Sequence, residues 1–209
     1  MPLRLFVSFW IIATAVQAQT VVLTVLERDV YEATNLLRTQ PRAFIPDLLR
    51  LRARFRGKRM QLGFRTWLET SEGTAAIDEA LTFLKYARPV PKLRLSPSLI
   101  HSARDQVRDQ IHSGLVGHFG RDGSSPRTRM RRYAEILGKS GENISYGGYG
   151  GHSGRDIVLG LLIDDGEKTR GHRVNLFDPS YAFTGVACGP HRRYLYFCVM
   201  DLVAQLYVK

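Results

Sequence analysis

The stretch TGVACGPHRRYLYFC, residues 184–198, decides the fold class. Apolar, β-branched and aromatic residues flank the turn sequence GPHRR, a pattern that predicts a β-hairpin with strands over 182–188 and 194–203. Arms of equal length place Cys188 opposite Cys198. In an oxidising compartment this arrangement predicts a cross-strand disulfide, and two buried free thiols are the alternative.

Upstream of the hairpin, apolar residues recur at helical spacing in several segments. Thr74 and Ser96 are candidate N-cap residues, and Pro97 suits the first helical turn. Residues 118–140 are expected to form a loop with at most one short helix near 126–136, and a strand is expected over 141–146. Dispersed helices and a terminal hairpin predict a single α+β domain with helices packed on an antiparallel sheet. The expected helices cover about residues 30–40, 74–87, 97–113 and 157–163.

The first residues have the layout of a signal peptide. Arg4 precedes an apolar run over 5–13, and small residues end at Ala18, so we expect cleavage that leaves Gln19 first and removes residues 1–18. An uncleaved anchor is the alternative, but a bilayer span needs about 20 apolar residues and this run is shorter. No later stretch is long and apolar enough to span, so we expect an extracellular or periplasmic protein.

The chain is strongly basic. It has 30 Lys and Arg against 19 Asp and Glu, a formal charge of +11, which favours anionic partners. No acid occurs from Leu48 to Leu68. This segment predicts a surface for anionic lipid or polysaccharide, with a solvated loop as the alternative. No nucleic-acid-binding motif is present, and nucleic acid is not an expected partner. The candidate anion-binding residues are Arg50, Arg52, Arg54, Arg56, Lys58 and Arg59, followed by Arg65.

Two adjacent acids end the apolar helix expected over 157–163. Acids at a helix C-terminus oppose the macrodipole, and a helical wheel places Asp165 within the apolar stripe, where a carboxylate needs a partner. One interpretation is an internal salt bridge to Arg170, His172 or Arg173. The other is a metal-ligand or acid–base site that includes Asp164 or Asp165.

Two further residues are candidates for such a site. His118 follows a helix end, and Glu142 opens the strand expected over 141–146. Their spacing fits no compact metal motif. Ser, Thr and Cys residues occur in no recognisable nucleophile motif, so a covalent mechanism is not expected.

Four short motifs occur in order along the chain: Gly117–Phe119, Gly141–Ile144, Arg170–Leu176 and Gly185–Ala187. In this order they resemble the CAP superfamily of bacterial type, which groups cysteine-rich secretory proteins, antigen 5 and pathogenesis-related proteins. Asn35 with Arg38, and Leu95 with Leu99, also look like that family. The similarity runs from Tyr31 to about 203 and is strongest from Lys92. It suggests N-terminal helices over 19–91, with a basic insertion from Arg50 to Gly73, and a core over 92–209 of the same domain.

The resemblance implies an α-β-α sandwich with a central antiparallel sheet and a cleft lined by two histidines and two acids, which in some members holds a divalent cation. By their motifs these are His118, His172 and Glu142. The fourth position is Asp164 by resemblance and Asp165 by the wheel. Two neutral imidazoles favour zinc over calcium, with occupancy falling as pH drops through about 6.5.

Functions of three classes are compatible with these features. The first is a secreted binding module for lipid, sterol or anionic envelope polymer. The alternative is a metal-dependent extracellular hydrolase with Glu142 or an aspartate as general base on metal-bound water. The third is adhesion or signalling without chemistry.

Overall fold

The computed structural model describes residues 21–147 and 153–208. The signal-peptide prediction therefore lies outside the described residues. The helices are α1 (Val25–Thr39), α2 (Ile45–Arg52), α3 (Thr74–Tyr86), α4 (Pro97–Ser113), α5 (Pro126–Arg131), α6 (Gly154–Ile163) and α7 (Gly171–Phe177), with a 3₁₀ turn at Pro41–Phe44. The strands are β1 (Phe55–Arg56), β2 (Arg59–Gln61), β3 (Trp67–Glu69), β4 (Arg94–Leu95), β5 (Ala134–Tyr146), β6 (Phe183–His191) and β7 (Leu195–Val208).

The main sheet is built on the hairpin β6–β7. Its strand order is β4-β6-β7-β5, and β7 pairs antiparallel with both neighbours. Cys188 lies opposite Cys198, and the two form a disulfide, as predicted. The expectation of an antiparallel sheet holds for the long strands and is wrong for β4, which runs parallel to β6.

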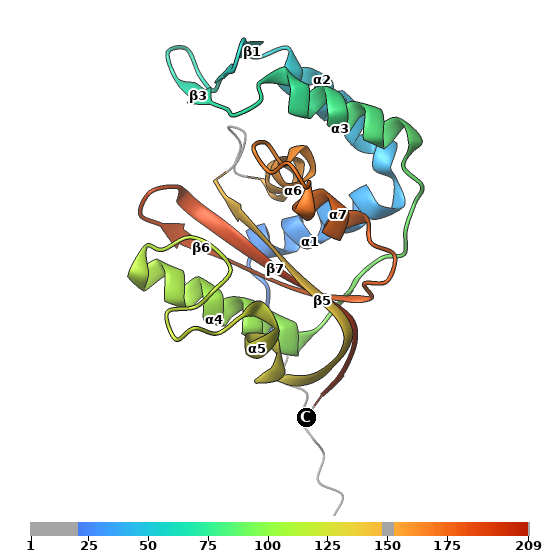
Figure 1. The fold of residues 1–209 in the computed structure, drawn as a ribbon, viewed down its shortest axis with the longest axis vertical. Helices are drawn as coiled ribbons and strands as arrows, with labels where there is room; N and C mark the ends of the chain where they lie inside the picture. The colour runs from blue at the N-terminus through green and yellow to red at the C-terminus, as the bar shows by residue number, and fades with distance from the viewer. Residues whose placement is uncertain (1–20, 148–152, 209) are drawn as a thin grey trace, which may run out of the picture.

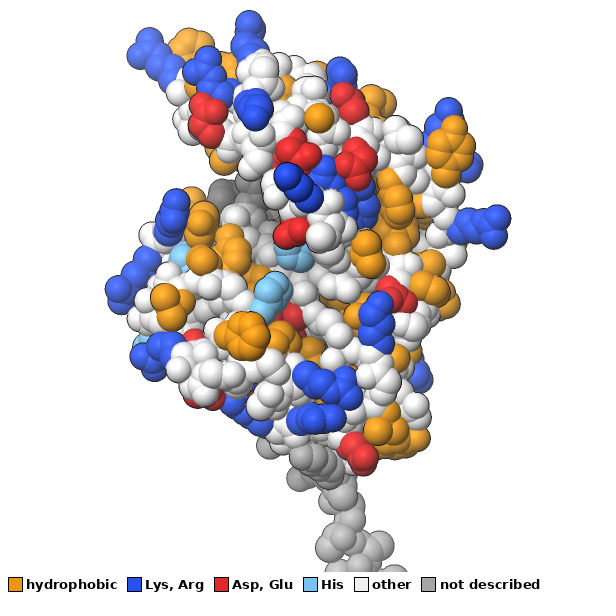
Figure 2. All heavy atoms as spheres, in the orientation of Figure 1, with side chains coloured by type: hydrophobic (Ala, Val, Ile, Leu, Met, Phe, Trp, Pro, Cys, Tyr) orange, Lys and Arg blue, Asp and Glu red, His pale blue; other side chains and the backbone are white. Residues whose placement is uncertain are grey.

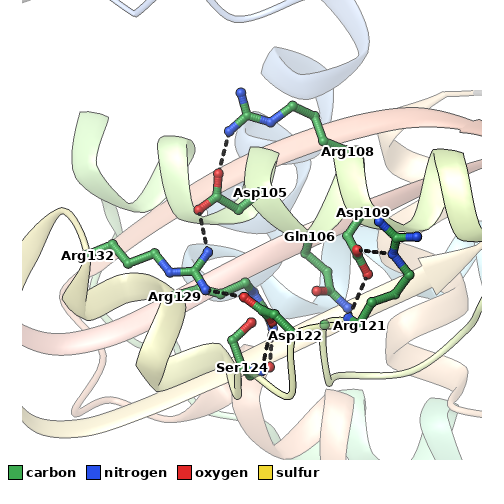
Figure 3. A pocket seen from close by; sticks show the side chains of 10 residues that line it. Asp105, Gln106, Arg108, Asp109, Arg121, Asp122, Ser124, Arg129 and Arg132 are labelled. Carbon is green, nitrogen blue, oxygen red and sulfur yellow. Dashed lines mark hydrogen bonds and ion pairs between the residues drawn. The ribbon is translucent and has the colours of Figure 1, made fainter.

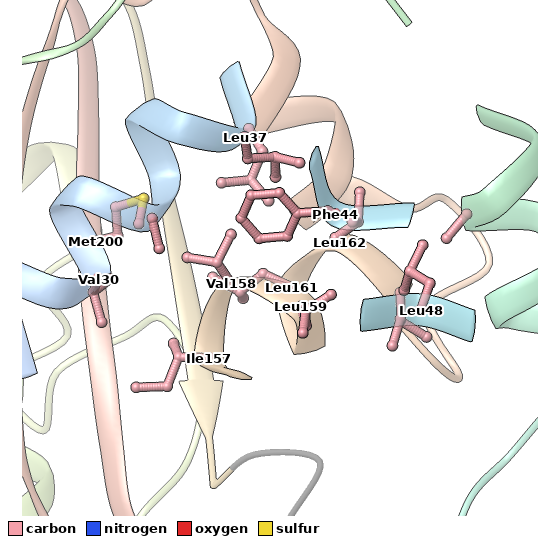
Figure 4. Close-up of a cluster of buried hydrophobic side chains, with 14 of the residues drawn as sticks. Val30, Leu37, Phe44, Leu48, Ile157, Val158, Leu159, Leu161, Leu162 and Met200 are labelled. Atoms are coloured by element: carbon pink, nitrogen blue, oxygen red, sulfur yellow. The ribbon is translucent and has the colours of Figure 1, made fainter. Parts of the chain in front are cut away.

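Helices cover both faces of this sheet (Figure 1). α4 and α5 lie on one face, α1, α6 and α7 lie on the other, and α2, α3 and a small antiparallel sheet of β1, β2 and β3 form a further layer beyond α6. The predicted α+β class and α-β-α sandwich are therefore confirmed. α6 is buried on nearly every side, as its composition predicts: its apolar residues meet Leu37 of α1 around the ring of Phe44 (Figure 4).

Two glycines allow close approach between layers. A Cβ on Gly185 of β6 would lie 2.1 Å from the carbonyl carbon of Leu99, so α4 packs directly on this strand. A Cβ on Gly154 would lie 2.2 Å from the backbone nitrogen of Val30, so α6 packs equally closely on α1. Any side chain at either position would force the layers apart.

Several boundaries differ from the prediction. β5 begins at Ala134, within the expected loop. The first part of the strand is hard to recognise in the sequence because a register irregularity between Leu137 and Ser140 interrupts the alternation of its side chains, and Gly138 there has φ +65°. α5 accordingly ends before the expected short helix does. Gly73, rather than Thr74, is the N-cap of α3.

The basic segment is ordered rather than a loop. It forms the end of α2 and the small sheet of β1, β2 and β3. Within residues 21–147 and 153–208, no helix combines the length and apolar character that a bilayer crossing requires.

Candidate functional site

His118 is held beside β5 by the end of α4. The side chains of Gln106 and Gln110 both donate to the carbonyl of Gly117, and the Gly117 N–H donates to the hydroxyl of Tyr146, 2.7 Å away. Burial raises the pKa of Tyr146, so its hydroxyl stays protonated and available for these contacts. The segment after α4 is thereby fixed although it has no regular secondary structure.

Glu142 orients the His118 ring. Its Oε1 lies 2.8 Å from Nδ1 of His118, and its side chain is 1% exposed, whereas that of His118 is 45% exposed. The other carboxylate oxygen accepts from the guanidinium of Arg129, at 2.6 Å, which also donates to the His118 carbonyl. A buried carboxylate needs such a partner, so Arg129 stabilises the negative charge that Glu142 presents to the imidazole.

His172 has an equivalent partner in Asp164. Nδ1 of His172 lies 2.6 Å from Oδ1 of Asp164, and the backbone N–H of His172 donates to Oδ2. His172 lies in the first turn of α7, so Asp164 sits at a helix N-terminus. The C-terminal carbonyls of α6, from Leu162 and Ile163, accept instead from Arg173. Asp164 follows the C-terminus of α6, where the helix dipole opposes a negative charge, but the N-terminus of α7 stabilises that charge.

Asp165 lines the same hollow as His172, but its carboxylate is engaged elsewhere. It accepts from the backbone N–H groups of Ser71 and Glu72, ahead of α3. The helical wheel does not apply to Asp165, because α6 stops at Ile163, Asp164 is in the left-handed region with φ 58°, and the chain turns before Asp165. Asp164, the position suggested by the resemblance, is the acid that contacts His172.

The two histidines converge. Their ring centroids are 6.5 Å apart, close enough for one small ion or polar group to contact both. β5 makes this possible, because successive side chains on a strand face opposite sides. Glu142 faces the α4 side, whereas the amide of Asn143 donates to the His172 carbonyl and accepts from Asn175, which joins α7 to the strand.

This arrangement changes the predicted metal site. Both carboxylates are engaged with the Nδ1 atoms of the imidazoles, as outer partners of metal-binding histidines commonly are. That leaves the Nε2 atoms of His118 and His172 as the donors. Among the described residues, no group of three or more His, Cys, Asp or Glu side chains has a metal-binding arrangement. The four-ligand site does not fit this geometry; two imidazole donors fit an ion whose coordination is completed from solution or by a ligand.

Asp201 is a buried acid directly behind the site. It lies opposite Glu142 in the β5–β7 register and is fully buried. Burial raises the pKa of Asp201 well above its usual range, and the charge of Glu142 raises it further, while the Ser102 hydroxyl and the charge of Arg129 lower it. Sequence reasoning missed both Asp201 and Arg129. An acid within the apolar strand sequence was a signal for Asp201, whereas Arg129 was hidden among other arginines.

A groove of about 640 Å³ leads away from His172 and Asp164. It runs between the small sheet, α6 and the end of the β6–β7 hairpin. Figure 2 shows histidine side chains at the hollow between these layers. Its walls are mainly apolar and aromatic: Leu62, Leu68, Ile144, Leu161, Tyr194 and Tyr196.

A second cavity of 340 Å³ lies between α4 and the segment before α5 (Figure 3). Its side chains neutralise one another: Arg132 pairs with Asp122 at 2.6 Å, and Arg121 pairs with Asp109 at 3.1 Å. Hydrogen bonds from Ser124, followed by that from Arg132, lower the pKa of Asp122. We assign no ligand to this internally paired cavity.

The predicted anion-binding residues divide into two groups. Arg50 pairs with Asp47, Arg52 pairs with Asp78, and Arg54 donates to backbone carbonyls of β2 and the turn after it. These three make contacts within the chain, although Arg50 and Arg52 are also exposed. Arg56, Lys58, Arg59 and Arg65 are exposed as well.

Comparison with known proteins agrees with the geometry. The model of the cysteine-rich secretory protein family, CAP, matches residues 31–202. An extracellular protein with an SCP domain from Bacillus anthracis is similar in structure at 18% identity and TM-score 0.43, over 56% of this chain and 35% of that one. An outer surface protein from Borrelia burgdorferi is similar at 14% identity and TM-score 0.46, over 56% of this chain and 80% of that one. No curated protein matches. Because the family model spans most of its length, the chain belongs to the CAP family of cysteine-rich secretory proteins.

Proposed function

We propose that this protein is an exported binding module that takes an elongated, largely apolar ligand, a lipid or sterol, in the groove beside His172. The groove carries the proposal. Its volume of 640 Å³ lies in the range of small-molecule sites, and apolar walls with a few polar groups at one end are typical of such sites.

The two ends of the groove differ in character. Tyr194 and Tyr196 offer aromatic surface with a polar tip, and Arg193 adds a cation at the hairpin. Asp164 and His172 form the polar opposite end. A ligand with an apolar body and a polar head is complementary to this division.

The polar end is also where a divalent ion would bind. Nε2 of His118 and Nε2 of His172 would hold it, and nitrogen donors favour zinc. Bound there, the ion would supply a positive charge for the ligand's polar head.

The test is binding of a fluorescent fatty acid and a fluorescent sterol to the purified mature protein. Leu68→Arg places a charged chain in the groove wall, and Leu49→Arg makes the same change on exposed α2, away from the groove. We expect Leu68→Arg to weaken binding at least about tenfold, the cost of placing a charge in an apolar contact, and Leu49→Arg to leave it unchanged. Wild-type protein that binds neither probe, or equal binding by both variants, would overturn the proposal.

A metal-dependent hydrolase is the second candidate, and the two His–carboxylate pairs favour it. Glu142 is a poor general base in this geometry because its oxygens are engaged by His118 and Arg129. Asp164 is similarly engaged by His172. Hydrolysis of an ester or peptide substrate with added zinc, abolished by His172→Ala in a folded protein, would support this candidate over simple binding.

A further inference from the structure

The small sheet carries an apolar side chain that packing does not explain. Phe64, in the turn between β2 and β3, is 89% exposed, the highest value among the large hydrophobic side chains of the described residues. Phenylalanine has no polar atom that could benefit from water. A phenyl ring exposed in a turn is available for contact with an apolar partner, and burying it there would be favourable.

The small sheet also carries exposed cations, and one of them lies next to this ring. Arg56 and Lys58 lie at the β1–β2 turn, at the opposite end of β2 from Phe64, and neither has an ion-pair partner among the described residues. The Arg65 guanidinium lies 5.7 Å from the centroid of the Phe64 ring, and Arg59 lies 5.6 Å from that of Trp67. Figure 2 shows Lys and Arg side chains beside hydrophobic ones at the end of the molecule where Figure 1 places β1 and β3.

Little negative charge offsets these cations. Glu69 is the acid within the small sheet, and it lies 3.9 Å from Arg59 with both side chains largely exposed. An exposed pair of this kind is weak and screened by salt. The small sheet therefore presents net positive charge, with Phe64 and Arg65 exposed at one end of it.

We propose that this small sheet is a membrane-docking element, in which Phe64 enters the interface of a bilayer and the exposed cations of the sheet, Arg65 beside Phe64 and the others along the strands, contact anionic lipid headgroups. The combination favours a membrane over a polysaccharide. An acidic polymer would use the cations alone and has no apolar layer for a phenyl ring, whereas a bilayer interface accommodates both. Docking at this site is a separate activity from ligand binding in the groove, and it does not require the groove to hold a ligand.

The same strands link the two features. Leu62 and Leu68, on either side of the Phe64 turn, line the groove. Docking through Phe64 would therefore hold the small-sheet wall of the groove next to the bilayer, from which an apolar ligand could be taken.

The experiment is sedimentation of the mature protein with vesicles of phosphatidylcholine, with and without phosphatidylglycerol. We expect binding to the anionic vesicles that weakens as salt rises, because the Debye length falls from about 10 Å at 0.1 M to about 3 Å at 1 M. Phe64→Ser, which leaves every charge in place, should weaken vesicle binding roughly tenfold or more, as expected for loss of a buried phenyl group. Its matched control is Phe119→Ser, at a 69% exposed phenylalanine outside the small sheet.

The charges need a separate pair of variants. Arg56→Ser with Lys58→Ser should reduce binding at low salt, whereas Arg88→Ser with Lys92→Ser removes the same charges from an exposed segment elsewhere and should not. If Phe64→Ser binds vesicles as tightly as wild type while the Arg56 and Lys58 changes abolish binding to both vesicles and heparin, the element is a polyanion patch and the proposal fails. Absence of wild-type binding to anionic vesicles also overturns it. Phe64→Ser should still bind the soluble fluorescent probes, which separates failure of docking from failure of the groove proposal.

Discussion

Replacing Arg38 with methionine would remove a guanidinium that ties three parts of the fold together. Arg38 of α1 is fully buried. Its Nε donates to the Pro91 carbonyl ahead of β4, and Nη1 donates to the carbonyls of Leu176 and Asp178 at the end of α7. Nη2 donates to the Tyr181 carbonyl, just before β6. Methionine keeps an unbranched apolar stem and loses all four hydrogen bonds.

The size of the effect follows from opposing contributions. Hydrogen bonds to charged groups contribute about 1.5–3 kcal/mol each, so the four together give roughly 6–12 kcal/mol. Burial lowers the pKa of Arg38 from 12.5 to about 10, against a smaller raising effect of Asp178. That shift corresponds to a desolvation cost of about 3 kcal/mol that the variant no longer carries. Water reaching some of the freed carbonyls reduces the loss further, and we expect about 4 kcal/mol net.

Urea unfolding followed by circular dichroism measures this loss. A decrease of about 4 kcal/mol is a large part of the 5–15 kcal/mol typical of a domain. The control is Arg42→Met, whose exposed guanidinium donates to the Lys85 carbonyl and should change stability by less than about 0.5 kcal/mol. A loss below about 1 kcal/mol for Arg38→Met would refute the reasoning, because it would mean that the four bonds hardly exceed the cost of burying the charge.

Two further predictions concern the sheet. The raised pKa of Asp201 means that the folded state binds its proton more tightly than the unfolded state, so the free energy of unfolding should fall as pH rises above the usual carboxyl range near 4. Asp201→Asn should flatten this dependence and be the more stable protein at pH 8. Urea unfolding at several pH values checks this, and parallel curves for the two proteins would contradict it. Replacing both Cys188 and Cys198 with alanine should cost at most about 3 kcal/mol, since the disulfide closes a short loop with a sequence separation of 10. Thermal unfolding measures that loss, and thiols that react with alkylating reagent in unreduced wild-type protein would show that the bond is not formed.

Local patterns in the sequence were sufficient for much of the fold. Equal hairpin arms fixed the pairing of Cys188 with Cys198, and the apolar composition of α6 predicted its burial. The first half of β5 was missed because Gly138, at its irregularity, resembles a loop residue. The ordered small sheet was missed because alternating arginines suggest a solvated segment when their partners, such as Asp78, lie far along the chain.

The site was only partly predictable, because contacts between residues far apart in the sequence determine it. Motif resemblance supplied His118, Glu142 and His172, but the helical wheel selected Asp165 because a wheel assumes that the helix continues. The roles of the acids depend on tertiary distances that spacing does not contain. Asp201 shows this most clearly, since its position opposite Glu142 follows from strand register.

A carboxylate orients each of the two imidazoles in the same way, although different groups stabilise the charges of the two carboxylates. Arg129 compensates the charge of Glu142, whereas the backbone N–H groups at the start of α7 compensate that of Asp164. Each carboxylate accepts at Nδ1, so the proton of a neutral ring is on Nδ1 and the lone pair is on Nε2. When both rings are neutral, these lone pairs lie on rings whose centroids are 6.5 Å apart. A cation bound through Nε2 of each ring would leave both His–carboxylate contacts in place, because those contacts use Nδ1 and already orient the rings.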